Sequence, residues 1–208
     1  MNVATASDPG SSRGLSRRGR ERKIEMLEAA LRIVGRDGLA ALSMRSLAVE
    51  AGMPLGATTY YFTSKSALVA EAFRLHASRE TERVLHAIRQ LPAEPSARQL
   101  ADQMTNFLLG GLTKHRRQLI SEYELLVGAT REPELASLSR SWQQAMQREL
   151  RRVAKKLGSP QPAIDAQLLL GLLAGLEVDH LSAEPDTTDQ EAIRAVIQRA
   201  VGALFPPP

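Results

Sequence analysis

The chain has 208 residues, of which 43% are hydrophobic and 24% are charged, an ordinary composition for a globular protein of one or two domains. It contains no cysteine, which excludes disulfides, thiolate metal sites and cysteine nucleophiles. The net charge of +4 is unevenly spread, because residues 13–23 hold five arginines and one lysine against a single acid. Such a segment favours a polyanionic partner, nucleic acid or a membrane surface, although a solvated tail has the same composition.

The first elements expected along the chain are a disordered basic arm over residues 1–18 and a helix from about Glu21. Apolar residues at Ile24, Leu27, Leu31 and Val34 recur at spacings of three and four, which predicts that they form the buried face of this helix. The glycines at positions 35 and 38 are expected to end it.

Three further helices are predicted by their end signals. Ser43 is a suitable N-cap for a short second helix, which Gly52 stops as a C-terminal glycine does. Pro54 suits the first turn of a short third helix that ends near residue 62. Ser64 is expected to cap a long fourth helix that runs to about residue 89.

Five longer amphipathic helices follow a boundary near residues 91–96. They are predicted near 96–114, 116–130, 133–157, 162–183 and 189–204, with prolines and aspartate at their starts and glycine or proline at their stops. No segment has the alternation and the β-branched enrichment of a strand. The predicted fold class is therefore all-α, with about nine helices.

The short second and third helices, with a glycine between them, describe a helix-turn-helix unit, whose last helix enters the DNA major groove. In that helix Leu55, Gly56, Ala57 and Thr59 are small enough to let the backbone approach the bases, and methyl and hydroxyl groups can contact them. The adjacent aromatic run "YYF" has two interpretations. The hydroxyls at positions 60 and 61 can reach phosphate oxygens, or the rings are packed in the core, which is the interpretation we favour for position 62.

The run "ALSMRSLAVEAGMPLGATTYYFTSKSALV", residues 41–69, resembles the DNA-binding domain of TetR-type (tetracycline-repressor-like) transcriptional regulators. The family pattern has a Thr or Ser cap, an inward Ile/Leu-Ala pair, Ala-Gly-Val, a short recognition helix, Tyr-x-His-Phe, and then Ser-Lys and a leucine. This chain departs from it where Thr59 replaces the usual first tyrosine, Tyr61 replaces the histidine and Thr58 replaces an aliphatic residue. The departures leave open whether Thr59 makes the phosphate contact of that tyrosine.

The resemblance implies that residues 19–66 form the helix-turn-helix DNA-binding domain, with the fourth helix continuing to about residue 90. At Arg45 it implies a contact with guanine or phosphate, although an exposed helical arginine is an equal alternative. The basic arm is expected to reach along the DNA backbone or into the minor groove, in a salt-sensitive way. The residues expected at the DNA are Ser43, Met44, Arg45, Leu55, Gly56, Ala57, Thr59, Tyr60, Tyr61 and Lys65.

The resemblance further implies that residues 67–208 bind a small effector and form a homodimer. Residues 168–181 are apolar on most of their circumference, which indicates a buried helix. With the last helix it is expected to pack against its twin as a four-helix bundle, the alternative being a core helix within one chain. The expected interface residues are Leu168, Gly171, Leu172, Gly175, Ile193, Val196, Ile197 and Ala200.

The effector pocket is expected where polar or aromatic side chains interrupt the apolar faces of these helices. Each candidate also has an ordinary alternative as a core or surface residue. The candidates are Phe107, Glu122, Tyr123, Leu126, Trp142, Met146, Leu173 and Glu177.

The function expected from these features is that of a homodimeric repressor, released from a palindromic operator by a small-molecule effector. The alternative is an architectural DNA-binding protein held by charge without sequence choice. An enzyme is not expected, because no nucleophile–base pairing, metal-ligand spacing or phosphate loop is evident. We also expect no cofactor, no metal and no membrane-spanning segment, and we expect the chain to act in the cytoplasm.

Overall fold

The computed structural model describes residues 15–182 and 188–206, and every regular element within these ranges is helical. The helices follow one another as the sequence predicts, which confirms the all-α expectation. In chain order the described elements are α1 (Arg17–Asp37), the 3-10 turn η1 (Leu39–Ala41), α2 (Met44–Glu50), α3 (Leu55–Tyr61), α4 (Lys65–Arg89), α5 (Ala97–Leu112), α6 (Arg116–Gly128), α7 (Pro133–Lys156), α8 (Pro162–Leu181) and α9 (Gln190–Leu204).

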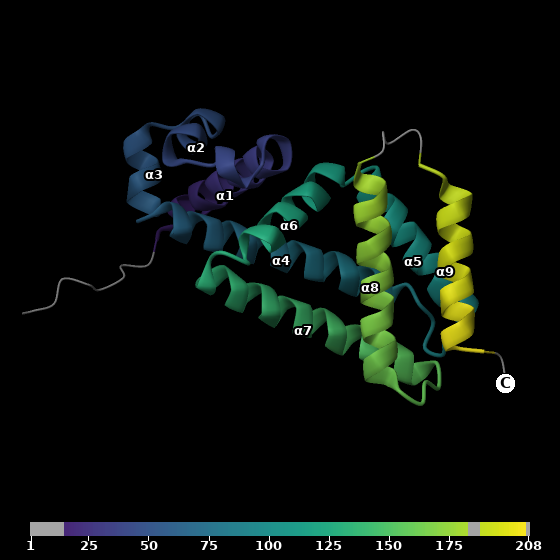
Figure 1. Ribbon diagram of the computed structural model, residues 1–208. Coiled ribbons are helices and arrows are strands. Elements are labelled where there is room, and N and C mark those ends of the chain that lie inside the picture. The colour runs from purple at the N-terminus through teal and green to yellow at the C-terminus, as the bar shows by residue number, and fades with distance from the viewer. Residues whose placement is uncertain (1–14, 183–187, 207–208) are drawn as a thin grey trace, which may run out of the picture.

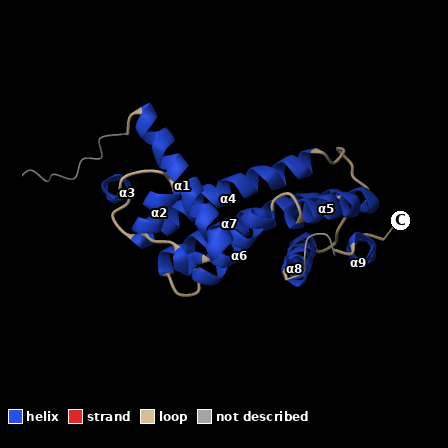
Figure 2. Cartoon of the chain, turned by 90° about the horizontal axis from the view of Figure 1, so that it is seen from above, coloured by secondary structure: helices blue, strands red, loops and turns tan. Residues whose placement is uncertain are grey.

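Helices α1, α2 and α3 form a small cluster at one end of the molecule, and α4 runs from this cluster into the rest of the chain (Figure 1). Helices α6 and α7 pack beside α4, while α8 and α9 cross the far end against α7 and α5. Seen from above, α8 and α9 lie side by side and nearly end-on (Figure 2). The small N-terminal unit is therefore joined to the larger helical unit by α4 and α6.

Two hydrophobic cores hold these units together. The first joins α1 to α4 and reaches Leu125 of α6 and Leu135 of α7, and it encloses the buried ring of Phe62, which is a core residue as expected. The second is built from α5, α7, α8 and α9. Burial of one large apolar side chain contributes about 2 kcal/mol to the free energy of folding, so the two cores supply most of the free energy that favours the folded state.

Helix α1 differs from the prediction in two respects. It begins at Arg17, after Ser16, whose Oγ accepts a hydrogen bond from the N–H of Gly19 at 3.2 Å, so residues 17 and 18 are helical. Ile24 is 45% exposed, so its prediction as a buried residue is wrong. The buried face is centred on Met26, Ala29 and Ala30, which the predicted face did not include, and Ile24 lies at its edge. The rest of the predicted basic arm, residues 1–14, lies outside the described residues.

The turn between α2 and α3 depends on a serine cap and a glycine. Ser43 Oγ accepts a hydrogen bond from the N–H of Ser46 at 3.0 Å, and Ser46 Oγ accepts one from the N–H of Ser43 at 2.8 Å. Both ends of this capping box fix the start of α2. At the other end Gly52 has φ +62°, a left-handed conformation that disfavours side chains.

Substitution of Gly52 by alanine is expected to lower the free energy of unfolding by about 1 kcal/mol. The added Cβ has nothing within 4 Å, so the loss is purely conformational. Gly110→Ala is the matched control, because that site is equally open but lies inside helix α5. There alanine is expected to gain about 0.5–1 kcal/mol. Urea denaturation of both variants checks this, and losses of equal size would contradict it.

Helices α1 and α6 approach each other at a glycine. A Cβ on Gly35 would lie 2.4 Å from the carbonyl oxygen of Arg117 and 2.7 Å from Ser121 Oγ. Ser121 Oγ also donates a hydrogen bond to the carbonyl oxygen of Leu31 at 2.9 Å. The backbones of the two helices are therefore in direct contact, and α6 supports the N-terminal unit from below its first helix.

Candidate DNA-binding surface and effector cavity

Helix α3 exposes one narrow, uncharged face. Leu55 is 45% and Tyr60 74% exposed, and Gly56 and Thr59 are exposed between them. Thr59 Oγ1 donates to the carbonyl oxygen of Gly56 at 3.1 Å, which leaves the hydroxyl oxygen able to accept a further bond. This face combines small side chains with two hydroxyl groups, a combination suited to close contact with base edges and phosphates.

The other side of α3 is fixed by packing. Thr58 is fully buried, and its Oγ1 donates to the carbonyl oxygen of Leu55 at 2.8 Å. Ala57 and Tyr61 are partly buried against the first core, and the Tyr61 ring meets that of Tyr60 edge to face at 5.2 Å. Of the residues expected at the DNA, these two therefore have less free surface than Thr59 and Tyr60.

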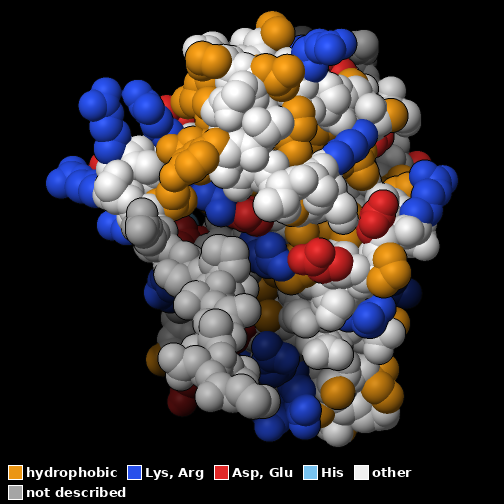
Figure 3. Space-filling view, turned by 90° about the vertical axis from the view of Figure 1, so that its left-hand side faces the viewer, with side chains coloured by type: hydrophobic (Ala, Val, Ile, Leu, Met, Phe, Trp, Pro, Cys, Tyr) orange, Lys and Arg blue, Asp and Glu red, His pale blue; other side chains and the backbone are white. Residues whose placement is uncertain are grey.

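Residues flanking α3 complete the candidate surface. Arg45 is exposed on α2, whereas Met44 is partly buried and the Ser43 side chain is engaged in the cap. Lys65 opens α4, and its Nζ donates to the carbonyl oxygen of Ala40 at 3.4 Å. Figure 3 looks onto this end of the molecule, where uncharged side chains cover much of the surface and Lys and Arg side chains project around it.

A cavity of about 350 Å³ lies among α4, α5, α6, α7 and α8. All eight residues expected at an effector pocket line it, although they come from four different helices. Around them the wall is mostly apolar, with Val84 and Ile88 from α4, Leu91 from the segment after it, and Leu100 and Met104 from α5. A pocket of this size and character is suited to a drug-sized organic molecule.

Glu122 carries the first carboxylate of the cavity, and its side chain is 12% exposed. Its Oε2 lies 2.9 Å from Nε2 of His76, which is itself buried on α4. Burial raises the pKa of Glu122, while the hydrogen bond and the charge of His76 oppose this shift. The ordinary alternative for Glu122, a surface charge, is therefore wrong, because the carboxyl points into the molecule.

Glu177 carries the second carboxylate, and this one is buried. Its Oε2 accepts a hydrogen bond from the hydroxyl of Tyr123 at 2.8 Å. Burial, assisted by the nearby charge of Glu122, raises the pKa of Glu177 to about 7 from an ordinary value of 4.5. Burial and the same carboxylate raise the pKa of Tyr123 as well, so its phenol stays protonated and donates.

Sequence profiles of known families match both parts of this architecture. The profile described as "Bacterial regulatory proteins, tetR family" matches residues 26–72, and "Tetracyclin repressor-like, C-terminal domain" matches residues 95–205. The chain belongs to the TetR family of bacterial transcriptional regulators. The helix-turn-helix unit therefore lies within the part of the chain that matches the TetR-family profile, and the α5 to α8 residues of the cavity lie within the part that matches the C-terminal domain.

Individual relatives agree with this assignment. The nicotine-responsive transcriptional repressor HdnoR of Paenarthrobacter nicotinovorans is 24% identical over 134 residues, which are 64% of this chain and 67% of HdnoR. A solved TetR-family structure from Streptomyces coelicolor A3 is 30% identical, with a TM-score of 0.67 over 86% of this chain and 98% of that one. The multidrug-binding protein EbrR with ethidium is 29% identical, with a TM-score of 0.65 over 86% and 98%.

The TetR-family regulator exposes an apolar stripe on α8. Ile164, Leu168, Gly171, Gly175 and Val178 recur at spacings of four and three, and all five are exposed. One side of this helix has no cover within the described residues, so the alternative of a core helix buried within one chain is wrong, and packing against a second copy stays a prediction. A heptad-like apolar stripe is the pattern by which one helix packs along another.

The residues expected at the dimer interface on α9 divide into two groups. Ile193 and Ile197 are 1% and 0% exposed within the second core, so these two predictions are wrong. They face α5 of their own chain, because the core stripe of α9 runs through positions 193, 197 and 201. Val196 is 44% exposed and Ala200 partly so, as is Leu172 on α8. These three keep surface that a partner can reach.

Several cavity residues of the regulator escaped the sequence analysis. Glu80 of α4 and Gln167 of α8 line the cavity, as do the exposed Gln143 and Gln147, one turn apart on α7. His76, one turn before Glu80, lies behind the wall as the partner of Glu122. The i, i+4 spacing of these polar pairs was the available signal. No helix among the described residues is long and apolar enough to cross a membrane.

Proposed function

We propose that this chain is a homodimeric repressor that binds a palindromic operator through α3 and leaves it when a small molecule occupies the cavity. The observation that carries the proposal is the double role of α6. One side of α6 gives Glu122, Tyr123 and Leu126 to the cavity wall. Its other side supports the DNA-binding unit, where Glu124 accepts the N–H of Leu39 at 2.9 Å.

A shift of α6 is thus transmitted directly to α1 and η1. Because a ligand changes a conformational equilibrium only through its different affinity for two states, the effector must prefer the α6 position that misplaces α3. The relatives support a small-molecule effector, since HdnoR is nicotine-responsive and EbrR was crystallised with proflavin, ethidium and imidazole. A twofold dimer presents two copies of α3 and so requires two symmetric half-sites.

Selection of bound genomic fragments near physiological salt is expected to enrich one or a few palindromic sites. Tyr60→Phe should weaken binding to such a site about tenfold, because it removes one hydroxyl contact to a charged phosphate. The ring is 74% exposed, so the thermal midpoint should not change. Uniform recovery of fragments, with a steep salt dependence and no preferred site, would instead support the architectural alternative.

Leu168→Glu is expected to convert the dimer into a monomer. Leu168 is 52% exposed in the single chain, so the charge is harmless there but is buried opposite its own copy in a twofold interface. Sedimentation equilibrium measures the change, and operator affinity should fall with it. Glu191→Gln on α9 is a control that alters charge on an exposed position outside the α8 stripe. A mass unaffected by Leu168→Glu would exclude this face as the interface.

A further inference from the structure

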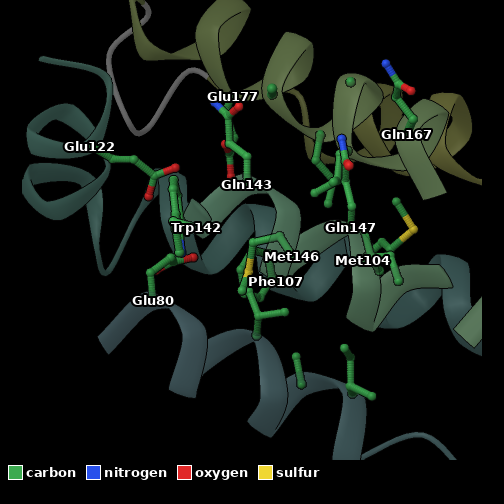
Figure 4. A pocket seen from close by; sticks show the side chains of 18 of the residues that line it. Glu80, Met104, Phe107, Glu122, Trp142, Gln143, Met146, Gln147, Gln167 and Glu177 are labelled. Atoms are coloured by element: carbon green, nitrogen blue, oxygen red, sulfur yellow. The ribbon is translucent and has the colours of Figure 1, made fainter. Parts of the chain in front are cut away.

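The cavity has two chemically different ends. Figure 4 shows Glu80, Glu122 and Glu177 gathered near Trp142 at one end, while Met104, Gln147 and Gln167 lie toward the other. The three carboxylates come from α4, α6 and α8, so the fold brings them together from separate parts of the chain. An acidic and aromatic end therefore faces an apolar end rimmed by neutral amides.

The negative charge at the acidic end is balanced only in part by the protein, because three carboxylates share one arginine, Arg83, and one histidine, His76. Arg83 is committed to Glu80 through bonds of 2.7 and 2.9 Å, and its guanidinium stacks 3.7 Å from the centre of the Phe107 ring. Among the described residues neither Glu122 nor Glu177 forms an ion pair with lysine or arginine: Glu122 is paired with the imidazole of His76, and Glu177 accepts from the phenol of Tyr123. Buried carboxylates without a cation are costly, and a bound positive charge relieves that cost.

We propose that the acidic end of the cavity is the binding site for a cationic nitrogen of an apolar aromatic effector, which is held between the carboxylates of Glu122 and Glu177. This inference rests on the proposed function, in which the cavity holds the effector. The rings of Trp142 and Tyr123 line the same end and add the attraction of an aromatic face for a cation. The apolar end then takes the hydrocarbon part of the molecule.

The occupant is an organic cation rather than a metal ion. No group of three His, Asp or Glu side chains among the described residues is placed to hold a metal ion. A cavity of about 350 Å³ with mostly apolar walls also greatly exceeds a metal site and matches a molecule of several rings. An aromatic cation satisfies both the charge and the shape of the space.

Binding of the cation at this site is coupled to the release of a proton from Glu177. Glu177 faces Glu122 and the phenol of Tyr123 from α6, and Glu80 and Arg83 from α4, and these groups with burial bring its pKa to about 7. A permanent cation favours the ionised carboxylate, so binding expels the proton that Glu177 holds near neutral pH. Affinity for such a cation therefore rises between pH 6 and pH 8.

The test compares two molecules with one bicyclic frame, 1-methylquinolinium and the uncharged 1-methyl-2-quinolinone. Neither titrates between pH 6 and pH 8, so any pH dependence belongs to the protein. Calorimetric titration of the full chain at pH 8 is expected to show at least tenfold tighter binding of the cation. This preference should shrink about tenfold at pH 6, and Glu177→Gln should abolish the change with pH. Quenching of Trp142, the single tryptophan, independently reports occupation of the cavity.

Glu122→Gln is the second variant, because it removes the other carboxylate and keeps an amide oxygen that can accept from His76. This variant should also bind the cation more weakly and bind the neutral compound with unchanged affinity. Equal affinities for the two compounds, or a pH dependence of cation affinity that survives in Glu177→Gln, would overturn the proposed cation-binding site. Binding of neither compound would overturn it too. None of these results alters the selection of operator fragments, which judges the proposed function separately.

Discussion

Gly35→Ala is expected to destabilise the protein by about 2–4 kcal/mol and to weaken operator binding. The new Cβ would lie 2.4 Å from the carbonyl oxygen of Arg117, a backbone atom that cannot move without displacing α6. Overpacking of this kind costs 1–3 kcal/mol, and separation of α1 from α6 also strains the bond from Ser121 to Leu31. Urea denaturation at fixed protein concentration measures the loss.

The contact at Gly35 has a graded control on α6 itself, where Gly128 faces η1. On Gly128 a Cβ would meet Leu39 Cδ2 at 2.5 Å, but that atom ends a flexible side chain and can move aside. Gly128→Ala is therefore expected to cost less than half as much as Gly35→Ala. Equal costs at the two positions, or a Gly35→Ala protein as stable as its parent, would show that α1 and α6 are not in rigid backbone contact.

The helices were predictable because their signals are local. Ser43 and Ser64 each accept a hydrogen bond from the backbone N–H three residues on, as N-caps do, and Gly52 takes the left-handed conformation expected of it. The prediction of which helix face is buried was wrong where the helix that covers the face lies far away in the sequence. Ile193 belongs to the core because α5 covers it, and nothing within α9 distinguishes that side from the side of Val196.

The cavity was predictable in its composition but not in its electrostatics. Aromatic and acidic residues on apolar helices identified Glu122 and Glu177 as unusual, since a charge on an apolar face needs a buried partner. The partner of Glu122 is His76, 46 residues away, and no spacing within one helix indicates such a pair. The packing of α4 against α6 brings His76 and Glu122 together, so the charge balance of the cavity follows from the fold and not from the sequence pattern.

Glu177→Gln is expected to stabilise the unliganded protein at high pH and to leave it unchanged at low pH. The folded pKa of about 7 exceeds the ordinary 4.5, so the ionised carboxylate is disfavoured by folding. The penalty is absent below about pH 4.5, grows as the pH rises through 7, and is complete above it. A difference of this size corresponds to about 3 kcal/mol, which the neutral amide avoids while its oxygen still accepts from Tyr123.

Urea denaturation of Glu177→Gln and the parent at pH 5 and pH 8.5 gives the difference directly. Glu94→Gln, at an exposed position in the loop before α5, controls for the loss of one surface charge and should show no such trend. A variant less stable than its parent at pH 8.5 would mean that the carboxylate is already compensated without a ligand. A gain confined to high pH would show that the cavity carries an uncompensated charge when empty, and that a cationic effector stabilises the fold by neutralising it.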